Sequence, residues 1–130
     1  MATIQRFEDV LGWQRARELT RQVYEFTCED LFSKDFALRD QIRRASISIM
    51  LNIAEGFARR TDKDFARFLS NAHGSAAEVQ SALYVALDQG YINDAQFKSA
   101  YVTCDECSRL VQGFSNFLLR ADLKTPDSRL

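Results

Sequence analysis

The stretch from Arg43 to Arg60, RRASISIMLNIAEGFARR, carries more apolar surface than one side of a helix can hold. At about 100° per residue, the apolar side chains in and beside it fall on two faces. One face is formed by Ile42, Ala45, Ile49, Ile53 and Phe57. The other is formed by Ile47, Leu51, Ala54 and Ala58. Two apolar faces predict two partners, of which the chain's own core is one.

Residues that break helices are rare in this chain. Its 130 residues include five glycines and one proline, so long uninterrupted stretches suit helices and few turns are available for a sheet. A chain of this length can bury a core as a single domain without disulfides or metal. The composition therefore favours a compact, all-helical protein.

The apolar periodicity predicts one all-α domain over residues 1–121. Its helices are expected at residues 9–28, 34–59, 62–89 and 94–120. Because the connections between them are short, consecutive helices must fold back on one another, so the predicted fold is an antiparallel up-down-up-down four-helix bundle. The last two helices each carry an unbroken heptad-like seam. The polar segment 122–130 has no periodicity and is expected to be disordered.

Side chains suited to capping mark the expected helix boundaries. Ser33 is expected to cap the second helix, with Asp35 in its first turn. Thr61 and Asp64 have the spacing of a capping box at the start of the third helix. Gly90 is expected to end that helix, and Asn93 and Gln96 form a second capping pair.

Chemically reactive side chains are few and scattered. Cys104 and Cys107 form a CxxC, but both fall on the seam of the fourth helix, where cysteine packs as a small hydrophobic residue. Cys28 has no local partner, and His73, the one histidine, flanks the apolar stripe of the third helix. No nucleophile elbow, P-loop or dinucleotide-binding glycine pattern occurs. We therefore predict a protein that is not an enzyme, with no catalytic residues, no metal site and no cofactor.

Basic residues gather around the second helix and the start of the third. They are Arg43, Arg44, Arg59, Arg60, Lys63 and Arg67. Arginine forks match the geometry of phosphate oxygens, so these residues are the candidate nucleic-acid contacts. The alternative is a solvated surface whose cations pair with Asp40, Glu55, Asp62 and Asp64. Because the formal net charge of the chain is −1, any site for a polyanion must be local.

The second apolar face of the segment 34–59 predicts self-association, because soluble monomers seldom display such a patch. The candidate interface residues are Ile47, Leu51, Ala54, Asn52 and Glu55. Asn52 and Glu55 are either a solvent-facing stripe or polar groups that fix the register between subunits. Gly56 costs about 1 kcal/mol relative to alanine in a helix interior, and a close approach of two backbones is one reason to accept that cost.

Targeting signals are lacking in the sequence. The first residues, MATIQRFEDV, contain no apolar signal core, and no run approaches the roughly 20 apolar residues that span a bilayer. Three cysteines lack the density of a secreted disulfide scaffold. We expect a cytoplasmic protein with free thiols and no membrane partner.

Two sequence blocks carry a family resemblance. QIRRASISIMLNIAEGFARR and DFARFLSNAHGSAAEV resemble the small four-helix-bundle proteins encoded in intervening sequences of bacterial 23S rRNA genes, and FEDVLGWQRARELTRQVYEF is similar to the first helix of that family. The resemblance implies an antiparallel four-helix protomer that assembles as a ring-shaped homopentamer. A related branch, the accessory variability protein of diversity-generating retroelements, works with a reverse transcriptase and binds nucleic acid through a basic surface.

Two functions are therefore open at the level of sequence. The first is an oligomeric, RNA-associated or ribonucleoprotein adaptor that contacts phosphate through the six basic residues. The second is a protein-binding scaffold with no role in nucleic-acid binding. RNA affinity that falls steeply with salt favours the first.

Overall fold

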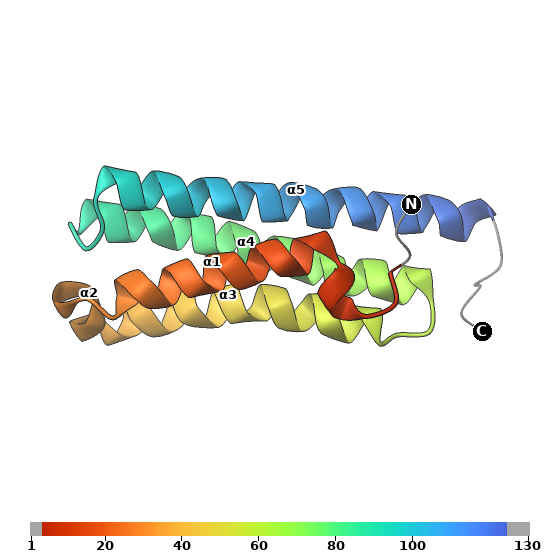
Figure 1. The fold of residues 1–130 in the computed structure, drawn as a ribbon, viewed down its shortest axis with the longest axis horizontal. Coiled ribbons are helices and arrows are strands. Elements are labelled where there is room, and N and C mark those ends of the chain that lie inside the picture. Colours follow the sequence, from red (N-terminus) through yellow and green to blue (C-terminus); the bar gives the residue numbers. More distant parts are fainter. Residues whose placement is uncertain (1–3, 125–130) are drawn as a thin grey trace.

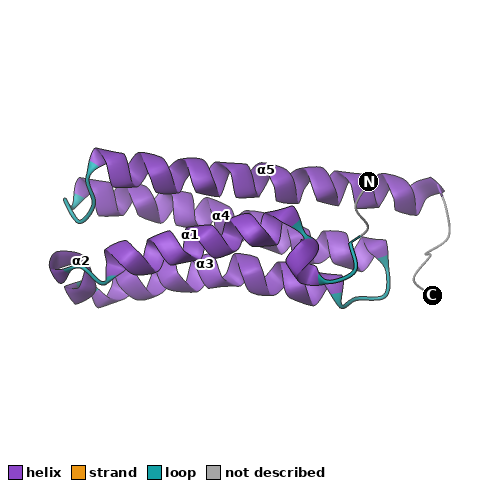
Figure 2. Ribbon diagram, viewed as in Figure 1, coloured by secondary structure: helices purple, strands orange, loops and turns teal. Residues whose placement is uncertain are grey.

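The computed structural model describes residues 4–124, and every regular element among them is helical. A short 3-10 helix, η1 (Phe7–Asp9), precedes α1 (Leu11–Thr27). The single-turn α2 (Asp30–Lys34) leads into α3 (Phe36–Phe57). The two longest helices, α4 (Asp62–Asp88) and α5 (Asp94–Lys124), complete the described part of the chain. Figure 2 shows only helices and loops over this range, which confirms the prediction of an all-α fold.

The four long helices lie side by side as a bundle. Helix α1 packs against α3 and α5, and α4 packs against the same two helices from the other side. Figure 1 shows that each long helix runs in the direction opposite to the one before it. Helix α3 is therefore a neighbour of α1 and α4, and the surface of α3 that faces neither of them is turned outward.

The core is built from the seams that the periodicity indicates. In α4 the whole predicted seam is buried, namely Phe65, Leu69, Ala72, Ala76, Val79, Leu83 and Ala86. From α3 the buried apolar side chains are Ile42, Ala45, Ile49 and Ile53. Cys104 and Cys107 of α5 are fully buried, and they occupy the seam as small apolar groups.

Capping interactions confirm most of the predicted boundaries. Thr61 Oγ1 accepts a hydrogen bond from the backbone N–H of Asp64 at 3.0 Å. Asn93 and Gln96 form a reciprocal capping box, with side-chain to backbone distances of 2.8 and 2.9 Å. After α4, Gly90 adopts a φ of 74°, the left-handed conformation that glycine tolerates best.

Two boundary predictions were wrong. The second long helix begins at Phe36 rather than at residue 34, and Asp35 caps it, accepting a hydrogen bond from the Leu38 N–H at 3.1 Å. Ser33 instead belongs to α2, where its hydroxyl donates to the carbonyl of Asp30. An aspartate is as good an N-cap as serine and favours the positive end of the helix dipole, which explains the shift.

The C-terminal part of the bundle also differs from the prediction. Helix α5 continues to Lys124, past the expected end at residue 120, so residues 122–124 are helical rather than part of a disordered tail. The rest of the predicted tail, residues 125–130, lies outside the described residues. None of the helices within residues 4–124 combines the length and apolar character that a bilayer span requires.

Candidate functional site

Helix α3 presents one apolar side to the core and another to the exterior. Ile49 and Ile53 are completely buried, whereas Leu51, between them in sequence, is 61% exposed. Ile47 and Ala54 are half-buried. The outward apolar side of α3 is therefore left uncovered by the described part of the chain.

The structure gathers most of the predicted interface on this side of α3. A shallow hollow of about 590 Å³ runs along the helix and is bordered by Tyr24 of α1. We call it the α3 face, and its remaining lining residues are Asp40, Arg43, Arg44, Ile47, Ser48, Leu51, Asn52 and Glu55. Four of the five predicted interface residues and two of the six predicted cations thus share one surface, while Ala54 does not line it.

Polar side chains within the α3 face are tied to the bundle. The Asn52 side-chain amide donates to the Ser48 carbonyl at 2.9 Å and to Ser48 Oγ at 3.1 Å. Ser75 of α4 lies 3.0 Å from the same hydroxyl and forms a hydrogen bond with it. These bonds hold Asn52 against its own helix, and its predicted role in fixing the register between subunits stays a prediction.

Gly56 permits a close approach of α3 and α4 at the end of the α3 face. A Cβ placed on this residue would lie 2.8 Å from both Phe65 Cδ1 and Phe68 Cβ, closer than real Cβ contacts come. Only glycine fits there without displacement of a neighbouring helix. The close backbone approach that the sequence suggested is therefore the reason for this glycine.

The six predicted cations do not form one patch. Arg43 and Arg44 lie in the first half of α3, while Arg59, Arg60, Lys63 and Arg67 surround the α3–α4 connection. Helix α3 rises about 20 Å between Arg44 and its last residue, Phe57. The cations therefore fall into two groups at different heights on the bundle.

Arg43 and Arg44 differ in how they are held. The Arg43 Nε donates to Thr27 Oγ1 at 2.8 Å, and its guanidinium lies 4.5 Å from the centre of the Tyr24 ring. Arg44 is exposed and makes no ion pair with any described residue. Arg43 thus links α3 to α1, while Arg44 is available to another molecule.

The group at the α3–α4 connection is divided in the same way. Arg59 pairs with Glu55 at 3.2 Å and Arg67 with Asp64 at 3.8 Å. Both guanidiniums also lie over the ring of Phe68, at 4.6 and 4.8 Å from its centre. The other two members of the group, Arg60 and Lys63, are exposed and form no ion pair within the described residues.

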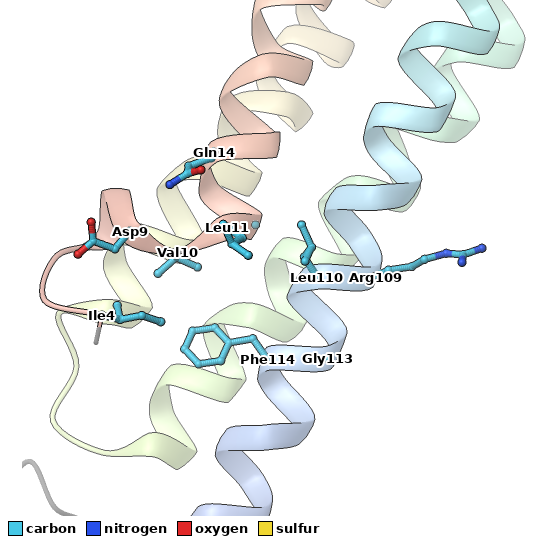
Figure 3. A pocket seen from close by; sticks show the side chains of 10 residues that line it. Ile4, Asp9, Val10, Leu11, Gln14, Arg109, Leu110, Gly113 and Phe114 are labelled. Atoms are coloured by element: carbon cyan, nitrogen blue, oxygen red, sulfur yellow. The ribbon is translucent and has the colours of Figure 1, made fainter. Parts of the chain in front are cut away.

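A second uncovered apolar surface was missed by the sequence reasoning. It is a groove of about 720 Å³ between the start of α1 and the second half of α5, which we call the α1–α5 groove (Figure 3). Leu11, 60% exposed, lies on the α1 side, and Leu110 and Phe114 lie on the α5 side. The groove draws on residues too far apart in sequence to form a local pattern.

Two of the three cysteines, Cys104 and Cys107, are buried in the core. Burial raises the pKa of the Cys104 thiol and of the Cys107 thiol to about 12, so both are protonated at neutral pH. Their Sγ atoms lie 3.3 Å from the carbonyls of Ala76 and Gly12. Within the described residues, no three His, Cys, Asp or Glu side chains are grouped in a way that could hold a metal ion.

Comparisons with known proteins find a matching family model and a similar crystal structure. The family model described as 23S rRNA-intervening sequence protein matches residues 8–113, which span α1, α3, α4 and most of α5. The chain is also similar to a crystal structure of a protein with unknown function from the S23 ribosomal protein family of Bacteroides thetaiotaomicron VPI-5482. That likeness, at 24% identity and a TM-score of 0.73 over 80% of this chain and 97% of the other, concerns the fold alone. No curated protein matches the sequence.

Proposed function

The chain belongs to the 23S rRNA-intervening sequence protein family, and from this premise we propose that it is a non-enzymatic, self-associating bundle that binds RNA as an adaptor. The observation that carries the proposal is the α3 face, a hollow lined by both the uncovered Leu51 and the unpaired Arg44. An apolar side chain favours a protein partner, and an exposed guanidinium favours phosphate.

Self-association is the first part of the proposed function. Leaving Leu51 and Ile47 in water is costly, and a second copy of the chain is the partner always present at equal concentration. The family resemblance implies a homopentamer, which we adopt as the proposed assembly. The three free cysteines are consistent with a reducing, cytoplasmic location.

RNA binding is the second part of the proposed function, and the contacts of the six basic residues within the chain support a smaller set of candidate phosphate contacts. Arg43, Arg59 and Arg67 are engaged by neighbouring rings, hydroxyls or carboxylates, so they must leave those partners before they can bind phosphate. Arg60 and Lys63 need no such rearrangement. We therefore assign the first phosphate contacts to these two residues and to Arg44, with shape and charge rather than base sequence deciding affinity.

A titration of structured RNA at two salt concentrations tests this assignment. The double variant Arg60→Ala/Lys63→Ala is expected to bind more weakly and to lower the slope of log affinity against log salt by about 1.5, because two phosphate contacts are lost. The matched control is Arg21→Ala/Lys98→Ala, which also removes one exposed arginine and one exposed lysine. This control is expected to behave like the unmodified protein.

Two results would contradict RNA binding through these residues. One is the absence of detectable, salt-sensitive binding by the unmodified protein, and the other is an equal loss of affinity in both double variants. The ion pairs of Arg59 with Glu55 and of Arg67 with Asp64 favour a second candidate function, because they partly neutralise the basic group. A scaffold that binds another protein would then retain a stable protein partner after nuclease treatment.

A further inference from the structure

A polar groove lies between α4 and α5, and it includes part of the basic group at the α3–α4 connection. Its volume is about 390 Å³, and we call it the α4–α5 groove. On each helix the lining residues recur at spacings of three or four, which places them on one side of that helix. The lining residues are Lys63, Ala66, Arg67 and Ser70 of α4 and Gln112, Ser115 and Leu119 of α5.

The polar side chains of the α4–α5 groove can all donate hydrogen bonds. They are two cations, Lys63 and Arg67, one amide, Gln112, and two hydroxyls, Ser70 and Ser115. None of the described residues that line the groove is an aspartate or a glutamate. Cations and neutral donors without a competing carboxylate favour an anion, and phosphate oxygens accept such charge-assisted bonds well.

Ser115 is the buried hydroxyl of this groove, and it lacks a partner in the described chain. The residue is only 7% exposed, yet no described residue forms a hydrogen bond with it. The buried Thr27 and Thr103 differ, because their hydroxyls donate to backbone carbonyls of their own helices at 2.7 and 3.0 Å. A buried polar group without a partner is rare, since it loses water without compensation. The Ser115 hydroxyl is therefore available to a molecule that enters the groove.

The charged and amide groups of the groove are only partly engaged within the chain. Lys63 is exposed and forms no ion pair with a described residue. Arg67 Nε lies 3.8 Å from Asp64 Oδ1, which is longer than a hydrogen bond, and both side chains are exposed, so this pair is weak. Gln112 Nε2 donates to Asn116 Oδ1 at 3.1 Å, which uses one of its two amide protons.

From these observations we propose that the α4–α5 groove holds one phosphate group of a bound RNA. Lys63 and Arg67 balance its charge, and the Ser115 hydroxyl donates to one of its oxygens. The inference rests on the RNA binding proposed above and adds the place where a phosphate is seated. The phosphate belongs either to the RNA backbone or to an RNA end, which carries a charge of about −1.5 to −2 at neutral pH. The two sources share the chemistry that the groove recognises.

Ser115→Ala tests the proposal with little disturbance to the bundle. Fluorescence anisotropy of a labelled RNA hairpin is expected to show an affinity about tenfold lower, because a hydrogen bond to a charged group is lost. Thermal unfolding without RNA is expected at the same or a higher temperature, because the deleted hydroxyl has no partner in the described chain. A serine with a purely structural role would give the opposite pattern. Ser46→Ala is the matched control, since Ser46 is a buried serine of α3 that does not line the groove.

Ser70→Glu tests the same groove by reversing its charge balance. Ser70 is exposed, so the helix tolerates the longer side chain, and the new carboxylate repels phosphate from the groove. RNA affinity is expected to fall more than in Ser115→Ala. The matched control is Ser81→Glu, which adds the same charge at an exposed position of α4, roughly 16 Å further along the helix. This control is expected to bind RNA like the unmodified protein.

The hairpin is prepared with a 5′-phosphate, with a 3′-phosphate or with hydroxyls at both ends. A tenfold effect of Ser115→Ala on one phosphorylated form alone supports the proposal with an RNA end in the groove, and an equal effect on all three supports it with a backbone phosphate.

Two results would overturn the inference, and they separate it from the proposed function. If Ser115→Ala and Ser70→Glu bind every hairpin like the unmodified protein, the groove holds no phosphate, although RNA binding elsewhere on the bundle stands. If the unmodified protein binds none of the hairpins, the proposed function fails as well.

Discussion

Replacing Gly56 with alanine is expected to weaken the bundle, although alanine is the better helix former. The added Cβ would lie 2.8 Å from Phe65 Cδ1 and 2.8 Å from Phe68 Cβ. The ring of Phe65 can tilt, but Phe68 Cβ is attached directly to the backbone of α4. Helices α3 and α4 would therefore have to separate locally by several tenths of an ångström.

The expected size of the effect follows from two opposing contributions. Overpacking a tight contact typically costs about 1–3 kcal/mol, and replacing a helical glycine with alanine returns about 1 kcal/mol. The net loss for Gly56→Ala is then about 1 kcal/mol. Gly74→Ala is the matched control, because a Cβ on Gly74 would meet nothing within 4 Å, and it is expected to stabilise the protein by about 0.5–1 kcal/mol.

Urea denaturation of the two variants at one fixed protein concentration measures this difference. The free energy of unfolding is expected to be about 1.5–2 kcal/mol lower for Gly56→Ala than for Gly74→Ala, with equal denaturant slopes. A fixed concentration is needed because self-association would couple stability to concentration. If both variants are stabilised equally, the close contact at Gly56 does not exist in solution.

Further predictions concern the thiols and the cap of α3. In the folded protein, only the exposed Cys28 is expected to react with a thiol reagent at neutral pH, whereas all three cysteines should react after denaturation. Three reactive thiols in the folded protein would refute the burial of Cys104 and Cys107. Burial raises the pKa values of Cys104 and Cys107 from 9.0 to about 12, so the folded protein holds these protons more tightly than the unfolded chain. The free energy of unfolding, measured by urea denaturation, is therefore expected to fall as pH rises from about 9 toward 12. Asp35→Ala is expected to lower the free energy of unfolding by about 1 kcal/mol, because the N-cap of α3 is lost. The Tyr91 hydroxyl donates to Asp35 at 3.0 Å, and this hydrogen bond raises the pKa of Tyr91. Ultraviolet titration of Asp35→Ala should therefore show a lower pKa for Tyr91. Asp35→Asn should keep most of the stability and still lower the pKa of Tyr91, and an unchanged pKa in both variants would contradict the contact.

The parts of the fold that depend on local periodicity were predictable from the sequence. The α4 seam from Phe65 to Ala86 is buried throughout, and the reciprocal cap of Asn93 and Gln96 forms as its spacing indicates. Both features need only residues within a few turns of one another. The same holds for the two faces of α3, where Ile49 is buried and Leu51 is exposed.

Features that depend on how the helices are arranged in space were predicted less well. The six basic residues are near one another in sequence, but the length of α3 separates Arg44 from Arg60. The α1–α5 groove is built from Leu11 and Phe114, which no local pattern connects. The cap of α3 was misplaced because Ser33 and Asp35 are both good N-caps, and only the fold decides which one faces the free N–H groups.

The mass of the unmodified protein in solution tests the central claim most directly, because the α3 face is proposed to be covered by another copy. Light scattering at micromolar concentration is expected to give a mass several times that of the 14.9 kDa chain, constant over a tenfold dilution. A mass near 14.9 kDa at every concentration would show that Leu51 remains exposed to water, and it would contradict the account.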